Sequence, residues 1–434
     1  MIYNLLLFLL SPLLLLYYAF RLATGKEDPA HWRERWGSYT KAGEGSLRFW
    51  VHAVSVGEVM AAKPILRELR KRHPEAFLLL TTTTRGGREV AQGIAGASAV
   101  AYFPLDFPWA VARALKAVRP DAVLLMEWEI WPNFLQAAKQ QGAKVAVLNG
   151  RISDKGLRRG LKAQWMMASG LACVDLFAMQ SDEDTRRAGL VGAPPGRTRT
   201  FGNTKFDESA TMLSIEERVK LRAELGIPEG ALVWICGSTR DGKDGIPDEE
   251  VLIIEAAKRV RERFPELRLI VAPRHLERVE AVKAHLPGSV QRSKGEHGAT
   301  LILDTFGELG RAYAIADVAF IGGSLAPWGG QSVFQPLAQG VPALFGPNMN
   351  NQRDIAALAI SEGAGEQVAD AVGLAEAVCR WLTLSPEEKA QNAQKARGLI
   401  ERNQGVSVKC LDAVEGLLPG LGGGGRRPEE GNGR

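Results

Sequence analysis

The feature that most constrains the fold is a glycine-rich connection between two short apolar runs, in residues 317–347, DVAFIGGSLAPWGGQSVFQPLAQGVPALFGP. The runs 318–321 and 341–345 have the length and composition of strands buried on both faces of a sheet. Glycine pairs at 322–323 and 329–330 allow sharp turns and a close approach of the backbone to a ligand. Residues 331–339 are predicted to form a short helix whose N-terminus would suit a phosphate. The pattern predicts half of a nucleotide-binding α/β domain, and a glycine-rich connection that binds nothing is the alternative.

The rest of the chain alternates strands and helices, as parallel sheets do. A chain of 434 residues is long enough for two such domains, which we expect at residues 46–206 and 215–418, with a linker at 203–214 between them. Residues 420–434, GLGGGGRRPEEGNGR, are glycine-rich and polar, and we expect a disordered tail. Two Rossmann-like domains facing a cleft, with the nucleotide signature in the second, describe the GT-B arrangement of glycosyltransferases. Predicted strands lie at 48–54, 77–83, 99–103, 122–126, 144–148, 176–180, 199–201, 232–236, 268–272, 300–303, 318–321 and 343–345.

The N-terminus predicts a membrane anchor at residues 1–21. Residues 2–20, IYNLLLFLLSPLLLLYYAF, carry no charge and are about long enough to cross a hydrocarbon core of roughly 30 Å. Tyr17 and Tyr18 would suit the interface, and the basic residues that follow place both domains in the cytoplasm, on the inner membrane. A cleaved signal peptide is the rival interpretation, but no small-x-small site precedes Arg21. Whether the anchor spans the bilayer or lies in one leaflet stays open at this point.

Composition excludes some classes of function. The net charge of +5 is modest, and no basic run interleaved with aromatic residues predicts a nucleic-acid groove. The four cysteines are scattered and form no CxxC pair, which argues against a zinc site and favours a reducing compartment. The mild basic excess is compatible with anionic lipid or a phosphorylated substrate.

A candidate catalytic loop, residues 52–58, follows the first predicted strand directly. Glu58 would lie in the opening turn of the next helix, where the helix dipole favours the ionised carboxylate. An ionised carboxylate that faces a cleft can take a proton from an attacking sugar hydroxyl. A glutamate that only stabilises its helix is an equally good interpretation of the pattern.

Several strings resemble the 3-deoxy-D-manno-octulosonic acid (Kdo) transferases of Gram-negative lipopolysaccharide synthesis. The most characteristic is SVGE at 55–58, and others follow in the family's order over nearly the whole chain. They are EWEIWPN at 127–133, NGRIS at 149–153, GNTKFD at 202–207, GST at 237–239, APRH at 272–275, DTFGEL at 304–309 and GGSL at 322–325.

The resemblance implies roles for particular residues. Glu58 is similar to the family's general base, and Glu129 and Lys205 match positions that support the transition state. The donor CMP-Kdo would contact Ser238, Pro273, Arg274, Gly307, Glu308, Leu309, Gly322, Gly323, Ser332 and Gln335. The acceptor would contact Ser55, Gly57, Arg151, Arg158 and Arg159, although a basic run such as the last three can also be a solvated helix face. No metal and no cofactor are expected.

One departure from the family concerns the donor. The family usually has histidine, asparagine and glutamate where this chain has Gln331, Ser332 and Gln335. An amide at 335 would hold the ribose hydroxyls more weakly than a carboxylate, by about 1–2 kcal/mol. The resemblance implies inverting transfer of Kdo from CMP-Kdo to a lipid A precursor, lipid IVA. A UDP-sugar transferase or 2-epimerase on the same frame, and a degenerate member that catalyses nothing, are the alternatives.

Overall fold

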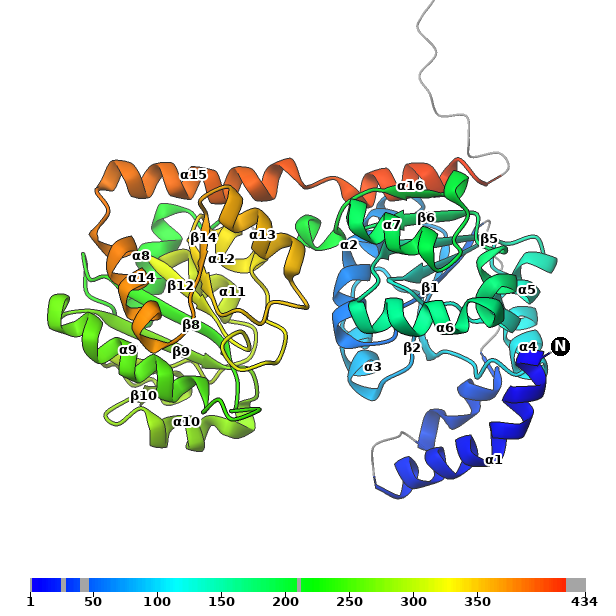
Figure 1. The fold of residues 1–434 in the computed structure, drawn as a ribbon, viewed down its shortest axis with the longest axis horizontal. Coiled ribbons are helices and arrows are strands. Elements are labelled where there is room, and N and C mark those ends of the chain that lie inside the picture. Colours follow the sequence, from blue (N-terminus) through cyan, green and yellow to red (C-terminus); the bar gives the residue numbers. More distant parts are fainter. Residues whose placement is uncertain (1, 25–28, 40–46, 209–211, 419–434) are drawn as a thin grey trace, which may run out of the picture. The chain divides into compact units, whose positions relative to one another are not determined.

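The computed structural model describes residues 2–24, 29–39, 47–208 and 212–418, which form two compact units (Figure 1). Unit 1 contains residues 1–208 and 405–434, and unit 2 contains residues 209–404. The predicted second domain, 215–418, therefore ends too late, because the chain returns to unit 1 at Gly405. The tail at 420–434 and part of the predicted linker lie outside the described residues.

Unit 1 is built on seven parallel strands in the order β3-β2-β1-β4-β5-β6-β7. The inner strands are apolar and buried, as in β4, where all five residues are buried, whereas the edge strand β7 is polar and has no buried residue. The order reverses direction between β1 and β4, and the carboxyl ends of these neighbours form the switch point where open α/β sheets bind ligands. All seven strands predicted for this part of the chain are present: β1 (Arg48–His52), β2 (Phe77–Thr82), β3 (Ala99–Tyr102), β4 (Ala122–Met126), β5 (Lys144–Gly150), β6 (Leu176–Met179) and β7 (Thr198–Thr200).

Helices cover both faces of this sheet, and each face has its own hydrophobic core. The helices and 3₁₀ turns are α1 (Ile2–Ala23), η1 (Pro29–Trp36), α2 (Val56–Arg72), α3 (Arg85–Gln92), α4 (Pro108–Val118), α5 (Pro132–Gln140), α6 (Asp154–Leu171), α7 (Asp182–Leu190), η2 (Pro195–Arg197), η3 (Thr204–Glu208) and α16 (Val406–Glu415). Among the described residues, α1 is the one helix long and apolar enough to cross a bilayer, with a mean hydropathy of 2.0.

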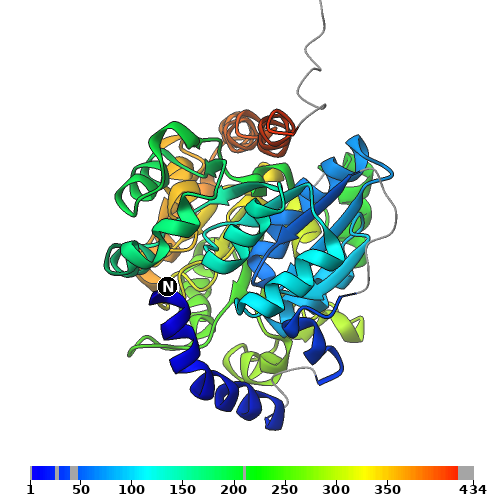
Figure 2. The ribbon, with the colours of Figure 1, turned by 90° about the vertical axis from the view of Figure 1, so that its right-hand side faces the viewer.

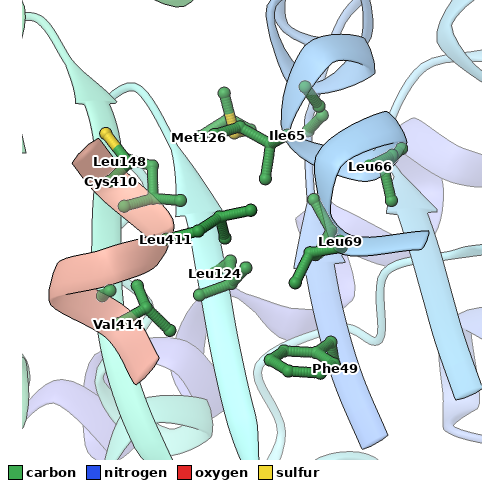
Figure 3. Packing of buried hydrophobic residues seen from close by; sticks show 14 of the residues in the cluster. Phe49, Ile65, Leu66, Leu69, Leu124, Met126, Leu148, Cys410, Leu411 and Val414 are labelled. Atoms are coloured by element: carbon green, nitrogen blue, oxygen red, sulfur yellow. The ribbon is translucent and has the colours of Figure 1, made fainter. Parts of the chain in front are cut away.

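The last helix completes the core of unit 1. In Figure 3, Cys410, Leu411 and Val414 of α16 point toward the sheet and toward α2. Asp207 accepts hydrogen bonds from the backbone N–H groups of Gly405 and Ser407, both at 2.6 Å, and so holds the start of the helix. Burying a side chain such as Leu411 contributes about 1.5–3 kcal/mol. Helix α16 is therefore an integral part of unit 1, although unit 2 separates it from the rest in sequence.

Unit 2 repeats the architecture with seven parallel strands in the order β10-β11-β9-β8-β12-β13-β14. The sequence predicted five of them and missed the two short edge strands, β10 and β14. The strands are β8 (Val233–Thr239), β9 (Arg268–Pro273), β10 (Val290–Gln291), β11 (Thr300–Ile302), β12 (Val318–Ile321), β13 (Ala343–Phe345) and β14 (Gly365–Gln367). The helices and turns are α8 (Ile215–Glu224), α9 (Glu249–Arg263), η4 (Leu276–Arg278), α10 (Val279–His285), η5 (Arg292–Lys294), α11 (Leu309–Ala312), η6 (Tyr313–Ile315), α12 (Phe334–Ala338), α13 (Arg353–Ser361), α14 (Ala371–Thr383) and α15 (Pro386–Arg402).

The helix predicted at 331–339 is shorter than expected. It begins only at Phe334 and ends at Ala338. The preceding residues are held in the loop, since the N–H of Gly330 donates to the carbonyl of Gly323 and that of Gln331 to the carbonyl of Gly322. Those bonds commit the backbone to turns before a helix can start.

Candidate functional site

The candidate site in unit 1 is a group of carboxylates at the switch point between β1 and β4. Glu58 lies in the first turn of α2, directly after β1, and only 9 % of its surface is exposed. One oxygen accepts a hydrogen bond from the backbone N–H of Val54 at 2.9 Å, and the other accepts one from the Ser55 hydroxyl at 3.1 Å. These bonds aim the carboxylate back along the loop instead of outward from the helix.

The protonation of Glu58 differs from the sequence-based expectation. Burial, reinforced by the charge of Glu127, raises the pKa of Glu58 to about 7. The hydrogen bonds from Val54 and Ser55 and the charge of Lys205 act in the opposite direction but do not compensate. The helix N-terminus therefore does not keep this carboxylate fully ionised at neutral pH. A pKa near the working pH is nevertheless what an efficient proton acceptor needs.

Two further glutamates follow β4. The indole N–H of Trp131 donates to Glu129 at 3.0 Å, and burial, followed by the charges of Glu58 and Glu127, raises the pKa of Glu129 to about 8. The structure therefore brings the two predicted carboxylates, Glu58 and Glu129, into electrostatic contact. Glu127 was missed as a site residue, although it directly follows a buried strand. Its φ of +58° is a conformation that costs a non-glycine residue about 1–3 kcal/mol and that clusters at functional sites.

Lys205 supplies positive charge to this group. It lies in η3, and burial lowers the pKa of its ammonium group, while the charges of Glu127 and Glu58 raise it. Arg151, which follows β5, also acts on Lys205 and so belongs to the same neighbourhood. Arg158 and Arg159, in contrast, lie exposed on α6, and their predicted contact with the acceptor stays a prediction.

In unit 2 the glycine loop after β12 is closed around a carboxylate of the protein itself. Glu249, the fully buried first residue of α9, accepts hydrogen bonds from five backbone N–H groups. The donors belong to Arg240 at 3.0 Å, Gly323 at 2.6 Å, Ser324 at 3.0 Å, Leu325 at 3.0 Å and Ala326 at 3.3 Å. The expectation that this glycine loop brings its N–H groups close to a ligand is therefore not met for residues 323–326, whose N–H groups bind Glu249 instead.

The shape of that loop still depends on its glycines. A methyl group on Gly322 would lie 2.3 Å from the carbonyl oxygen of Ser238, so only glycine permits the ends of β8 and β12 to approach this closely. Ser238 itself has a φ of +57°. Two of the predicted donor positions are thus adjacent at the switch point of unit 2.

Other predicted donor residues also come together. Glu308 directly precedes α11, and its carboxylate accepts hydrogen bonds from Thr305 and Arg292. Burial alone would raise the pKa of Glu308, but these bonds outweigh it and hold the pKa below its ordinary value. The Gln335 amide lies beside this segment, since a methyl group on Gly310 would be 3.4 Å from its nitrogen. The segment 307–309 and Gln335 therefore form one neighbourhood.

The remaining predicted positions are at strand ends or in loops. Pro273 ends β9, and the N–H of the exposed Arg274 donates to the carbonyl of Thr239 at the end of β8. Ser332 lies in the loop before α12. Within the described part of the chain, no three His, Cys, Asp or Glu side chains are arranged to hold a metal ion. The prediction of metal-independent chemistry itself stays a prediction.

Comparisons with known proteins point to one family. Residues 30–208 match the family model described as 3-deoxy-D-manno-octulosonic-acid transferase (Kdo transferase). The chain is 33 % identical to a 3-deoxy-D-manno-octulosonic acid transferase of Bordetella pertussis, over 85 % of this chain and 87 % of the relative. It is 27 % identical to the protein of the same name from Haemophilus influenzae, over 96 % of this chain and 98 % of the relative.

Solved structures show the same fold. A glycosyltransferase from Rickettsia africae aligns with a TM-score of 0.61 at 13 % identity, over 88 % of this chain and all of the other. A UDP-N-acetylglucosamine 2-epimerase from Listeria monocytogenes, described as putative, aligns with a TM-score of 0.57 at 13 % identity, over 89 % of this chain and 99 % of the other. With the two seven-stranded parallel sheets, these likenesses confirm the predicted GT-B fold of two Rossmann-like domains.

Proposed function

The chain belongs to the 3-deoxy-D-manno-octulosonic acid transferase family, and from this premise we propose that it transfers Kdo from CMP-Kdo to lipid IVA, a lipid A precursor, with inversion at the anomeric carbon. Family membership favours transfer over the epimerase and UDP-sugar alternatives. The observation that carries the proposal is Glu58, a carboxylate with a pKa near 7 at the switch point of unit 1, beside a lysine.

The proposed reaction is a single displacement. A hydroxyl oxygen of the acceptor attacks the anomeric carbon of Kdo, and the bond from that carbon to the CMP phosphate oxygen breaks. The electron pair of the broken bond leaves with CMP, and Glu58 takes the proton of the attacking hydroxyl. No covalent intermediate with the protein forms, so the configuration at the carbon inverts.

Positive side chains would support both the base, Glu58, and the departing CMP. Lys205 offsets the negative charge of the glutamates around the base, which keeps Glu58 able to ionise near neutral pH. In unit 2, Arg274 is an exposed cation at the end of β9, suited to the phosphate of CMP. We assign charge compensation on the departing CMP to such side chains, without a metal ion or cofactor.

We further propose that the protein works on the cytoplasmic face of the bacterial inner membrane. The apolar helix α1 supports attachment there, and the acceptor is itself a lipid. The partners are then CMP-Kdo, the anionic lipid A precursor and the surrounding lipids.

The decisive experiment is an assay of Glu58→Gln. Purified protein is incubated with CMP-Kdo and lipid IVA, and the lipid products are weighed by mass spectrometry. We expect wild-type protein to add Kdo and Glu58→Gln to turn over about 10²–10⁴-fold more slowly, the usual effect of losing a general base. Glu89→Gln, a change at an exposed glutamate on α3, is the matched control and should keep full activity.

A titration of CMP into the same preparations separates chemistry from binding. Unchanged CMP affinity in Glu58→Gln, together with the lost turnover, supports the assignment. Near-normal turnover would remove Glu58 from the mechanism, and absence of any Kdo product from the wild-type protein would refute the proposed function.

A further inference from the structure

The apolar surface of α1 needs a covering that the described chain does not supply. Its large side chains are mostly exposed: Ile2, Leu5, Leu6, Phe8, Leu9, Leu10, Leu13, Leu15, Leu16, Tyr17 and Phe20. No charged residue occurs before Arg21. An exposed apolar surface of this extent marks a membrane or protein contact. Acyl chains suit a charge-free surface bordered by a cation, because the cation can meet anionic headgroups.

The first part of α1 is bound to unit 1. The hydroxyl of Tyr3 donates to Asp106 at 2.7 Å, and the amide of Asn133 donates to Asn4 at 2.6 Å. The ring of Phe8 lies 5.9 Å from that of Phe107. Asp106 is buried and also accepts the backbone N–H groups of Asn133 and Phe134 that open α5, so this attachment point is part of the core structure.

The last part of α1 is bound to the same unit. Tyr18 is only 8 % exposed, and its ring lies 5.2 Å from that of Trp32 on η1. The guanidinium group of the buried Arg35 lies 5.4 Å from the Tyr18 ring.

A row of aromatic rings joins the two attachments. The ring centroids of Trp32 and Trp36 are 6.0 Å apart. The ring of Trp36 stacks on that of Phe107 with the same centroid distance, and Phe107 in turn lies beside Phe8. Residues 8 and 18 of the helix are therefore connected through unit 1 across Pro12. The helix bends along its length in both views (Figures 1 and 2), as a proline in its interior would cause.

These contacts decide how the helix can meet a bilayer. At 1.5 Å per residue, Tyr3 and Tyr18 are roughly 22 Å apart along the axis. A helix that spans the bilayer would carry Tyr3 and Asn4 to the far side, away from Asp106 and Asn133. We propose that α1 instead lies in the plane of the leaflet nearest to unit 1, with its exposed side among the acyl chains and both ends on the same side of the membrane.

Two neighbouring features fit this arrangement. Trp109 on α4 is 46 % exposed and lies 5.6 Å from Phe8, so it extends the apolar surface with a residue suited to the interface. Arg21 lies in the last turn of α1 and donates to the hydroxyl of Tyr17, so its charge can reach the headgroups. The inference does not depend on the proposed transferase reaction.

The first test measures the topology of the N-terminus. The full chain, extended before Met1 by an epitope and a protease site and carrying a second such site after Arg434, is bound to sealed vesicles of phosphatidylethanolamine and phosphatidylglycerol. Protease is added outside. We expect the N-terminal site to be cleaved as completely as the C-terminal one without detergent. Protection of the N-terminal site until detergent is added would mean that the helix spans, and would overturn the proposal.

The second test measures the attachment directly in the membrane-bound protein. Asn4→Cys combined with Asn133→Cys should form an intramolecular cross-link with a short bifunctional thiol reagent, detected by peptide mass spectrometry. The matched control combines Asn4→Cys with Arg119→Cys, an exposed position elsewhere on unit 1. This pair should form no intramolecular cross-link. Absence of the first cross-link in vesicles overturns the proposal. So does a stable dimer that fails to bind the vesicles, since a second copy would then cover the helix.

Discussion

Replacing Glu249 by Gln should loosen the glycine loop of unit 2. The carboxylate has two oxygens, of which one accepts from Ser324, Leu325 and Ala326 and the other from Gly323 and Arg240. A glutamine amide keeps one acceptor oxygen. If that oxygen accepts from residues 324–326, the amide NH₂ group faces the N–H groups of Gly323 and Arg240. Two hydrogen-bond donors then lie opposite a third, and neither backbone N–H has an acceptor.

The cost follows from the two orphaned N–H groups. A buried donor left unpaired costs about 1–3 kcal/mol, so about 2–6 kcal/mol is the upper range for both, because the Gly323 bond is buried and the Arg240 bond only partly so. The neutral amide escapes part of the penalty for burying a charge, which is also why burial raises the pKa of Glu249. We therefore expect a loss of about 2–4 kcal/mol, which corresponds to a roughly 30- to 700-fold larger population of the open loop at 1.4 kcal/mol for each factor of ten.

Hydrogen exchange by mass spectrometry measures this locally, which matters because a single unfolding free energy is not well defined for a chain of two domains. Peptides that contain residues 322–326 should exchange faster by that factor in Glu249→Gln, while peptides from the sheet of unit 1 stay unchanged. Glu255→Gln, on the exposed side of the same helix, is the control and should alter stability by less than about 0.5 kcal/mol. Equal exchange of the loop in wild-type protein and Glu249→Gln would refute the view that this carboxylate holds it.

Further predictions concern the site and the last helix. The value of kcat/KM for transfer should rise with pH, with an apparent pKa near 7. Glu127→Gln should lower this apparent pKa, because the charge of Glu127 raises the pKa of Glu58. An unchanged apparent pKa would contradict this. Unit 1 should lose stability as the pH rises from about 4.5 through 7, since the folded state holds the Glu58 proton more tightly than the unfolded state, and denaturation of Glu58→Gln should show a smaller loss. Gln335→Glu should bind CMP more tightly in calorimetric titration, and equal or weaker binding would mean that this side chain does not face the ribose. Asp207→Asn keeps one acceptor oxygen for the two N–H groups, so it should weaken the start of α16 by about 1–3 kcal/mol and speed proteolysis near Gly405, whereas an unchanged cleavage rate would show that the second hydrogen bond is dispensable.

The features that the sequence predicts best are those set by residues close together in the chain. Buried strands show as apolar runs, and a polar residue directly after such a run, like Glu58, is readily found at a strand end. Features that depend on contacts between distant parts of the chain could not be predicted from the sequence. The role of Glu249 requires knowing that β8 and β12 are neighbours, because only then does the start of α9 meet Gly323. The raised pKa of Glu58 likewise depends on burial and on Glu127, which lies 69 positions further along the chain (127 − 58).

Because α16 packs into unit 1, the ribosome makes the last part of that core only after it has made all of unit 2. At about 5–20 residues per second, the roughly 200 residues of unit 2 take on the order of 10–40 s to appear. During that interval the strands and helix α2 that α16 covers are complete but expose an apolar strip. A nascent chain in this state is a natural client for chaperones. A ribosome that stops before residue 405 releases a protein that has every residue of the carboxylate site. The core of unit 1 that α16 covers is then still exposed.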